Sequence, residues 1–257
     1  MVANRALARV AVAAACLAAV PALPGGVAPA GATTVQVAAA ASVEPALREL
    51  ATDFERASGH RLAVSSGSTG KLAAQVAQGA PFAVLLAADA EHPEALEKQG
   101  LAVAGTRVTF ARGRLVLWSA QPGLSLGPET LRAGRFAHLA IADPDVAPYG
   151  AAAVAALRRL GVYEAVAPKL VRGESVGQTF AFVKSGAAEL GFVALSQLGA
   201  AAVGSRWPVP EELHPPLLHQ AVLLAKGKDD PAARAFLAFL VSEPARAVLR
   251  HFGYTVP

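Results

Sequence analysis

Short runs suited to strands alternate with helical patterns along this chain from residue 35 onward. Runs at 35–41, 60–66 and 82–87 have the length and composition of strands, and helical spacing of apolar residues follows at 43–58, 71–78 and 93–99. Strands and helices in this order form right-handed βαβ units around a buried parallel sheet that is covered on both faces. We therefore predict an α/β protein.

The same alternation begins a second time near residue 114. The predicted strands of this second series are 114–119, 139–142, 170–172 and 190–195, its helices are 150–160 and 177–185, and a last strand at 220–224 precedes helices at 231–242 and 243–252. The two series are thus joined near 112–115 and again near 218–222. We predict two lobes with two hinge crossings: lobe I is 33–113 plus 220–257, and lobe II is 114–219. Hinged lobes suit the capture of a ligand between them.

Residues 1–32 have the pattern of a secretory signal peptide. Arg5 and Arg9 form a positive start, 10–23 is apolar but too short to span a bilayer, and Ala-Gly-Ala at 30–32 fits a cleavage site. This pattern predicts export to the periplasm.

The chain beyond this segment is nearly neutral and has no cysteine. Two of the 23 basic residues lie in the first 32, which leaves 21 against 19 acidic residues, a net charge of +2. Such a balance argues against a nucleic-acid partner and against a polybasic membrane patch. Cys16, the single cysteine, lies within the predicted signal. The competing interpretation is lipid attachment at Cys16, but Ala-Ala-Ala at 13–15 lacks the leucine usual before such a cysteine.

Four short turns, rich in small and hydroxyl-bearing residues, stand where strands give way to helices. They are Ala-Ala-Ala-Ser at 39–42, Ser-Ser-Gly-Ser-Thr-Gly at 65–70, Ala-Asp-Pro-Asp-Val-Ala-Pro-Tyr-Gly at 142–150 and Gly-Glu-Ser-Val-Gly-Gln at 173–178. Each leaves the first N–H groups of the next helix unpaired and directs the positive end of the helix dipole outward. Four such turns around one cleft would hold a small anion without a lysine or an arginine.

The hydroxyl-bearing turns each allow two interpretations. Ser42 is placed to cap the following helix, and it also stands at the rim where α/β sheets bind ligands. The turn at 67–72 is similar to a nucleotide phosphate loop, but Ser65 and Leu72 occupy positions that require Gly and Ser or Thr. Ser68 and Thr69 remain as two candidate hydroxyl donors to an anion.

The other two turns offer main-chain donors. Prolines at 144 and 148 stiffen the loop before Tyr149 and Gly150, whose N–H groups we expect to face the cleft. Val176 offers only its N–H, which needs no side-chain ordering when it binds. The plainer alternative for both turns is an ordinary loop between a strand and a helix.

Catalytic and metal-binding patterns are absent from the sequence. There is no Gly-x-Ser-x-Gly elbow and no His-Glu-x-x-His, and the histidines at 60, 92, 138, 214, 219 and 251 lack metal-ligand spacing. We therefore predict no cation site, no cofactor and no enzymatic activity. An exported serine hydrolase that uses Ser42 or Ser68 with a histidine is the alternative from a different class.

Taken together, these motifs resemble the periplasmic molybdate-binding proteins of ABC transporters over nearly the whole chain after residue 32. The matching stretches include Gly-Ser-Thr-Gly-Lys-Leu at 67–72, Gln-Gly-Ala-Pro-Phe at 78–82, Gly-Glu-Ser-Val-Gly-Gln at 173–178, Leu-Gly-Phe-Val-Ala-Leu-Ser-Gln at 190–197 and Phe-Gly-Tyr at 252–254. The resemblance implies a type II periplasmic binding protein fold, an α/β fold with a mostly parallel sheet in each lobe. It also implies a monomer that delivers molybdate or tungstate to a membrane permease.

The resemblance further implies which residues hold the ion. Ser42 supplies one hydroxyl and Ser68 or Thr69 a second, while Tyr149 and Val176 donate from main-chain nitrogen, and no charged side chain takes part. Two departures from the family stand out. Ala194 occupies a position where some members place a tyrosine hydroxyl, for which the Tyr149 hydroxyl is a possible replacement, and Ala83 stands where an aspartate is expected.

The chemistry of the ion fits a shell made only of donors. Molybdate and tungstate are dianions whose oxygens only accept, and charge-assisted hydrogen bonds offset the cost of burying them. Phosphate keeps a proton that needs an acceptor. Sulfate has the same charge and shape, so a receptor for sulfate or another small oxyanion is the alternative within this class.

Overall fold

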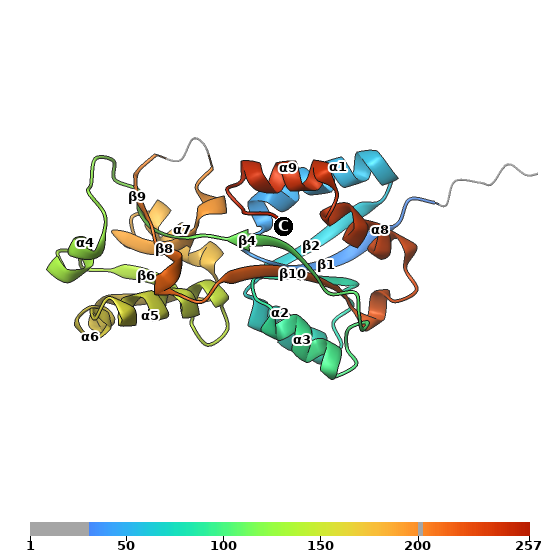
Figure 1. The fold of residues 1–257 in the computed structure, drawn as a ribbon, viewed down its shortest axis with the longest axis horizontal. Helices are drawn as coiled ribbons and strands as arrows, with labels where there is room; N and C mark the ends of the chain where they lie inside the picture. The colour runs from blue at the N-terminus through green and yellow to red at the C-terminus, as the bar shows by residue number, and fades with distance from the viewer. Residues whose placement is uncertain (1–30, 200–202) are drawn as a thin grey trace, which may run out of the picture. The chain divides into compact units, whose positions relative to one another are not determined.

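Two five-stranded sheets form the framework of the protein (Figure 1). The computed structural model describes residues 31–199 and 203–257, so the predicted signal peptide lies almost wholly outside the described residues. The first sheet has the order β2-β1-β3-β10-β4 and the second has the order β7-β6-β8-β5-β9. The predicted α/β architecture with two sheets is confirmed.

The first sheet combines three parallel strands with two antiparallel ones. Its strands are β1 (Thr34–Ala40), β2 (Arg61–Gly67), β3 (Val84–Ala87), β4 (Val108–Gly113) and β10 (Leu217–Leu223). Strand β1 runs parallel to β2 and β3, whereas β10 runs antiparallel to β3 and β4. The carboxyl ends of β1, β2 and β3 therefore meet at one edge of the sheet.

The second sheet repeats this arrangement. Its strands are β5 (Leu115–Ser119), β6 (Leu139–Ala142), β7 (Leu170–Gly173), β8 (Leu190–Ala194) and β9 (Ser205–Pro208). Strand β6 runs parallel to β7 and β8, and β5 runs antiparallel to β8 and β9. In both sheets every parallel strand except β8 is followed by an α-helix.

Helices cover both faces of the first sheet (Figure 1). On one face lie α1 (Glu44–Ser58), α8 (Pro231–Leu240) and α9 (Glu243–His251), and on the other lie α2 (Thr69–Ala77) and α3 (Glu91–Lys98). Alternate residues of β1 face the two layers, so Val37 and Ala39 join the cluster with α1, and Ala38 joins the cluster with α2. Burial on both faces explains why β1 is continuously apolar from Val37 to Ala40, whereas Thr34 and Gln36 before it are exposed.

The second sheet is covered in the same way. Helix α7 (Val176–Lys184) packs on one face and α5 (Pro148–Arg159) on the other, while α4 (Pro128–Ala133) and α6 (Tyr163–Val166) complete the elements. Ala140 of β6 packs with Val183 of α7, and Ile141 packs in the cluster that contains Leu157 of α5. The first residues of α5 and α7 thereby lie beyond the carboxyl ends of β6 and β7.

The chain passes between the sheets at two places. One residue separates β4 from β5, and the chain returns after β9 to enter β10 at Leu217, three residues before the predicted start of that strand (Figure 1). Strands β4 and β10 pair with each other on the first-sheet side of these connections. Strands β4 and β9 and helix α4 were not predicted from the sequence, and residues 108–113 are only partly buried, which weakens the apolar signal.

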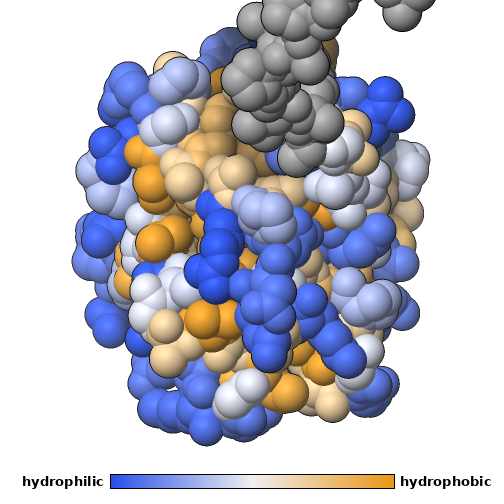
Figure 2. All heavy atoms as spheres, turned by 90° about the vertical axis from the view of Figure 1, so that its right-hand side faces the viewer, coloured by the Kyte–Doolittle hydropathy of each residue, from blue (hydrophilic) through white to orange (hydrophobic). Residues whose placement is uncertain are grey.

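The face of the protein at the first-sheet end is mixed in character. Hydrophilic side chains alternate with hydrophobic ones over its coloured part (Figure 2). Within residues 31–199 and 203–257, no helix is both long and apolar enough to cross a membrane.

Candidate functional site

All five residues predicted to hold the ion line one small cavity between the two sheets. The full lining is Ala40, Ala41, Ser42, Gly67, Ser68, Thr69, Ala88, Ala147, Pro148, Tyr149 and Val176. Its volume is about 10 Å³, roughly the room that one water molecule needs, against roughly 300–1,000 Å³ for pockets that hold drug-sized ligands. The cavity therefore leaves no room for an organic solute.

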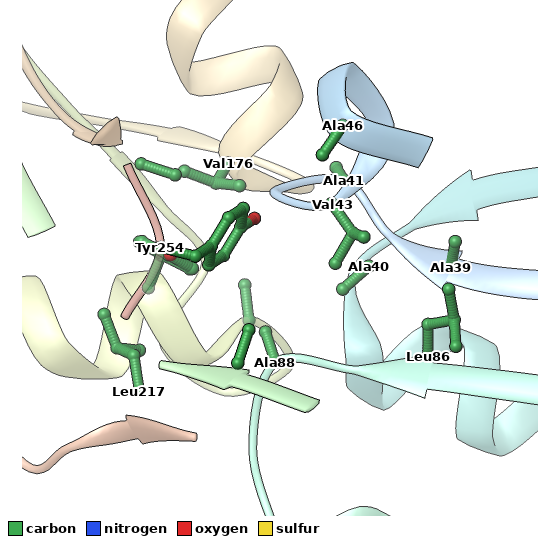
Figure 3. Close-up of a cluster of buried hydrophobic side chains, with 14 of the residues drawn as sticks. Ala39, Ala40, Ala41, Val43, Ala46, Leu86, Ala88, Val176, Leu217 and Tyr254 are labelled. Carbon is green, nitrogen blue, oxygen red and sulfur yellow. The ribbon is translucent and has the colours of Figure 1, made fainter. Parts of the chain in front are cut away.

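Four segments bring these residues together from distant parts of the sequence. Ser42 follows β1, Ser68 and Thr69 open α2, Tyr149 lies in the first turn of α5, and Val176 begins α7. In Figure 3, Ala40 at the end of β1, Ala41 after it, Ala88 after β3 and Val176 at α7 lie around one cluster of buried side chains. The first turns of three helices therefore border the cavity, and their dipoles favour negative charge there.

The main chain supplies unpaired donors around this space. The N–H groups of Ser42, Ser68, Thr69, Tyr149 and Val176 have no acceptor among the described residues. The expectation that Gly150 also offers its N–H was wrong, because this group donates to the Ala147 carbonyl at 2.9 Å. Helix α5 begins at Pro148, so Gly150 already lies inside its first turn.

The structure distinguishes the two hydroxyls of the α2 turn. The Ser68 hydroxyl is buried and has no hydrogen-bond partner, although Ser68 is the N-cap of α2. The Thr69 hydroxyl already accepts from the Ala88 N–H at 3.0 Å. A buried hydroxyl without a partner costs about 1–3 kcal/mol, so Ser68 is the residue of this pair that lacks a partner for its hydroxyl.

Ser42 does not cap the helix that follows it. The N-cap of α1 is Val43, and no side-chain oxygen caps that end. Instead the Ser42 Oγ lies 3.0 Å from the His219 Nε2. The Ser42 carbonyl accepts from the Tyr254 hydroxyl and from the Ser196 hydroxyl, each at 2.7 Å. The capping interpretation was wrong, and Ser42 is held at three points by residues remote in sequence.

His219 is the functional neighbour that sequence reasoning missed. Its side chain is fully buried on β10, and its Nδ1 lies 3.1 Å from the Leu217 carbonyl oxygen. The rings of Phe110, Tyr149 and Tyr254 meet it edge-on. Burial lowers the pKa of His219 to about 4, so the imidazole is neutral near pH 7. The sequence did offer one indication of this role, because His219 lies within 218–222, where the chain was predicted to cross back to the first lobe.

The Tyr149 side chain fills the space beneath Ser42. Its hydroxyl is buried without a hydrogen-bond partner, and burial raises the pKa of this phenol well above its usual value despite the nearby Ser42 hydroxyl. A Cβ added at Gly113 would lie 2.1 Å from the Tyr149 hydroxyl oxygen, so only glycine fits at this last residue of β4. Ala194, the position of a tyrosine in some family members, is buried in β8 and does not line the cavity.

Contacts between residues of the two sheets close the cavity. The Gly70 N–H donates to the Val146 carbonyl at 2.9 Å, and a Cβ at Gly70 would lie 2.9 Å from that oxygen. The Lys71 ammonium lies 3.0 Å from the Glu174 carboxylate at the surface. Ser42, Ser68, Thr69, Tyr149 and Val176 are each at most 5% exposed. An ion inside would thus be shielded from bulk water.

The cavity lining contains no charged side chain. A larger neighbouring cleft of about 360 Å³ carries Asp89, Glu91, His92 and Asp145. Across residues 31–199 and 203–257, no cluster of three or more His, Cys, Asp or Glu side chains has the arrangement of a metal site. The Ser42–His219 pair also differs from a hydrolase dyad oriented by a carboxylate, because the His219 Nδ1 meets a carbonyl.

Comparison with known proteins is consistent with this site. Residues 35–255 match the family model described as bacterial extracellular solute-binding protein. The molybdate-binding protein ModA of Azotobacter vinelandii is 48% identical over 227 residues, which cover 87% of this chain and 90% of that protein. ModA of Rhodobacter capsulatus is 42% identical over 226 residues, which cover 88% of this chain and 90% of that one.

A solved structure extends the likeness to three dimensions. The periplasmic molybdate-binding protein of Azotobacter vinelandii matches with a TM-score of 0.84 and 38% identity, over 87% of this chain and 99% of that one. The two-sheet architecture and the resemblance noted in the sequence are therefore both confirmed. The chain belongs to the family of bacterial extracellular solute-binding proteins, and the relatives it resembles within that family are molybdate-binding proteins.

Proposed function

We propose that this protein captures molybdate or tungstate in the cavity between its two sheets and delivers the ion to an ABC permease. One observation carries the proposal: the residues predicted from four separate turns converge on a single closed cavity without charged side chains. The names and high identity of the molybdate-binding relatives support the same ion. The role is solute binding rather than catalysis, as in the rest of the family.

The donor set matches the chemistry of a tetrahedral dianion. Ser42, Ser68, Tyr149 and Val176 bring hydroxyl and N–H groups, and a fully deprotonated oxyanion has only acceptors to offer them. Charge-assisted hydrogen bonds are roughly twice as strong as neutral ones, which offsets the loss of the ion's hydration. Thr69 contributes its N–H, and its hydroxyl hydrogen is also free to donate, because the hydroxyl oxygen only accepts the bond from Ala88.

The setting of this function is the periplasm. The family is extracellular, and a structural relative at 38% identity is called periplasmic. Residues 1–32 act as the export signal, and Cys16 is removed with them rather than lipidated. The exported protein works as a monomer, with lobes at 33–113 plus 220–257 and at 114–219. It needs no cofactor and no nucleic acid.

Isothermal titration of the purified protein with molybdate, tungstate, sulfate and phosphate tests this proposal. We expect one tight site for molybdate and for tungstate, much weaker binding of sulfate, and none of phosphate. Tight binding of sulfate without binding of molybdate would favour the alternative receptor. Failure of both molybdate and tungstate to bind would overturn the proposed function.

A further inference from the structure

The hydrogen bonds around His219 fix the direction in which the Ser42 hydroxyl points. A carbonyl oxygen only accepts, so the His219 Nδ1, at 3.1 Å from the Leu217 carbonyl, carries a hydrogen. In the neutral imidazole the Nε2 is then an acceptor. The Ser42 hydroxyl, 3.0 Å away, must donate to it. The hydrogen of Ser42 is thus committed to His219 and is not available to the cavity.

This arrangement conflicts with the binding of an anion. With its hydrogen directed at His219, the Ser42 oxygen can present only lone pairs to the cavity it lines. An oxyanion has only lone pairs as well, so the two groups would repel each other. If Ser42 turned its hydrogen toward the ion, the buried His219 Nε2 would lose its only hydrogen-bond donor. Ser42 can donate to the ion without that loss only if the bond between Ser42 and His219 reverses its direction.

We propose that His219 is a positioning residue that takes up a proton when the anion binds, so that its Nε2–H donates to Ser42 and Ser42 donates to the ion. This inference rests on the proposed function. It adds that the protein takes up one proton, at His219, for each ion it binds. The proton comes from the solvent, no covalent bond other than N–H forms, and the positive charge stays one hydroxyl away from the dianion.

Other ways of freeing Ser42 are less favourable. A shift of the single hydrogen from Nδ1 to Nε2 would leave the lone pair of Nδ1 facing the Leu217 carbonyl at 3.1 Å. That shift loses a buried hydrogen bond and places two acceptors in contact. Protonation keeps the bond to Leu217 and adds a charge that attracts the ion.

The surroundings of His219 explain why the anion would trigger this change. The titratable groups facing the ring are the phenols of Tyr149 and Tyr254, and burial raises the pKa of both, so neither is charged. The third aromatic ring against His219 is that of Phe110, which does not titrate. The charged group whose field reaches His219 is Asp89, and it raises the pKa of the imidazole. Without the ion, burial keeps the ring neutral. A dianion beyond Ser42 supplies the missing counter-charge.

The test measures protons taken up by the wild-type protein. Molybdate is titrated at pH 6 in several buffers of different ionisation enthalpy, and the buffer dependence of the heat gives the number of protons bound per ion. We expect a value close to one, with affinity rising up to tenfold per unit of pH decrease between pH 8 and 6. Tight binding with no proton uptake and no pH dependence would overturn the inference while leaving the proposed function intact. Absence of any binding would instead refute the proposed function.

Two variants assign the proton to its site. In His219→Gln the amide NH₂ can donate to Ser42 without titrating, so we expect binding to persist with no proton uptake. His92→Gln is the matched control, because His92 borders the neighbouring cleft and pairs with Asp89 at 2.9 Å, which raises the pKa of His92. We expect His92→Gln to keep the uptake. Loss of uptake in His92→Gln but not in His219→Gln would contradict the assignment to His219.

Discussion

At the scale of single residues, a buried hydroxyl without a hydrogen-bond partner indicates a ligand site only where it lines a cavity. Ser68, Tyr149 and Ser242 each bury a side-chain hydroxyl without a partner. Ser242 is the N-cap of α9 and does not line the cavity, whereas Ser68 and Tyr149 both do. Two unpaired hydroxyls in one small cavity point to a ligand that accepts hydrogen bonds.

Ser68→Ala should lower the affinity for molybdate by roughly 10- to 100-fold, because a hydrogen bond to a charged group contributes about 1.5–3 kcal/mol. Urea unfolding of the ligand-free variant should show no loss of stability, since the missing hydroxyl had no partner. Ser242→Ala is the matched control and should leave the affinity unchanged. An unaltered affinity in Ser68→Ala would remove this hydroxyl from the donor set.

Stability of the ligand-free protein should fall as the pH drops from about 6.5 to 4. The pKa of His219 lies near 4 in the folded protein, against 6.5 as its ordinary value. Between these two pH values the unfolded chain binds a proton at His219 and the folded chain does not. The free energy of unfolding therefore falls by about 3 kcal/mol in total. Urea unfolding at several pH values should show this loss in the wild type and a shallower one in His219→Gln. Parallel curves for the two proteins would contradict a buried neutral imidazole.

At the scale of elements, the sequence predicted most strands and missed β4 and β9. Strands β3, β6 and β8 are continuous apolar runs, β1 is apolar after Gln36, and all four were found within a few residues of their ends. Strand β2 was also found, although it is mostly exposed or half-buried. Strand β4 was missed, because a partly exposed strand beside charged residues has a weak pattern. The turns of the candidate site were found because glycine and hydroxyl residues gather where a strand gives way to a helix, although capping alone also favours such residues there. His219 was missed, because its role depends on pairing across more than 170 residues.

Gly113→Ala tests the close packing at the end of β4. The new Cβ would lie 2.1 Å from the Tyr149 hydroxyl oxygen and 2.6 Å from the His219 Cε1. Overpacking of this kind destabilises by about 1–3 kcal/mol, to be measured by urea unfolding. Adding Tyr149→Phe removes the nearer clashing atom and should restore part of the loss. Equal free energies of unfolding for Gly113→Ala and wild type would show that the surrounding residues move to accept the Cβ without loss of stability.

At the scale of the whole molecule, the two sheets are held together by few polar contacts around the cavity. Gly70 bonds to Val146, and Ser196 bonds to Ser42. The Lys71–Glu174 pair contributes little, since its side chains are 45% and 73% exposed and exposed pairs are worth about 0–1 kcal/mol. An ion bonded to residues from both sheets would add strong contacts to this small number.

Ligand should therefore stabilise the whole chain as one unit. At a molybdate concentration of 100 times its Kd, the free energy of unfolding should rise by about 2.7 kcal/mol. Thermal unfolding followed at both tryptophans, Trp118 of β5 and Trp207 of β9, should shift together with the far-ultraviolet circular dichroism signal. A shift in the tryptophan signal alone would mean that the ion stabilises only the second sheet.

The buried position of the five cavity residues has a consequence for unloading. The five residues are at most 5% exposed, so we expect an ion bound to them to leave when the bonds of Gly70 and Ser196 between the two sheets open. The contacts that retain cargo in a dilute medium are thus the same ones that a receiving transporter has to break. Release of the ion then requires these contacts to be broken, and the free energy for this must come from docking or from the transporter's own cycle.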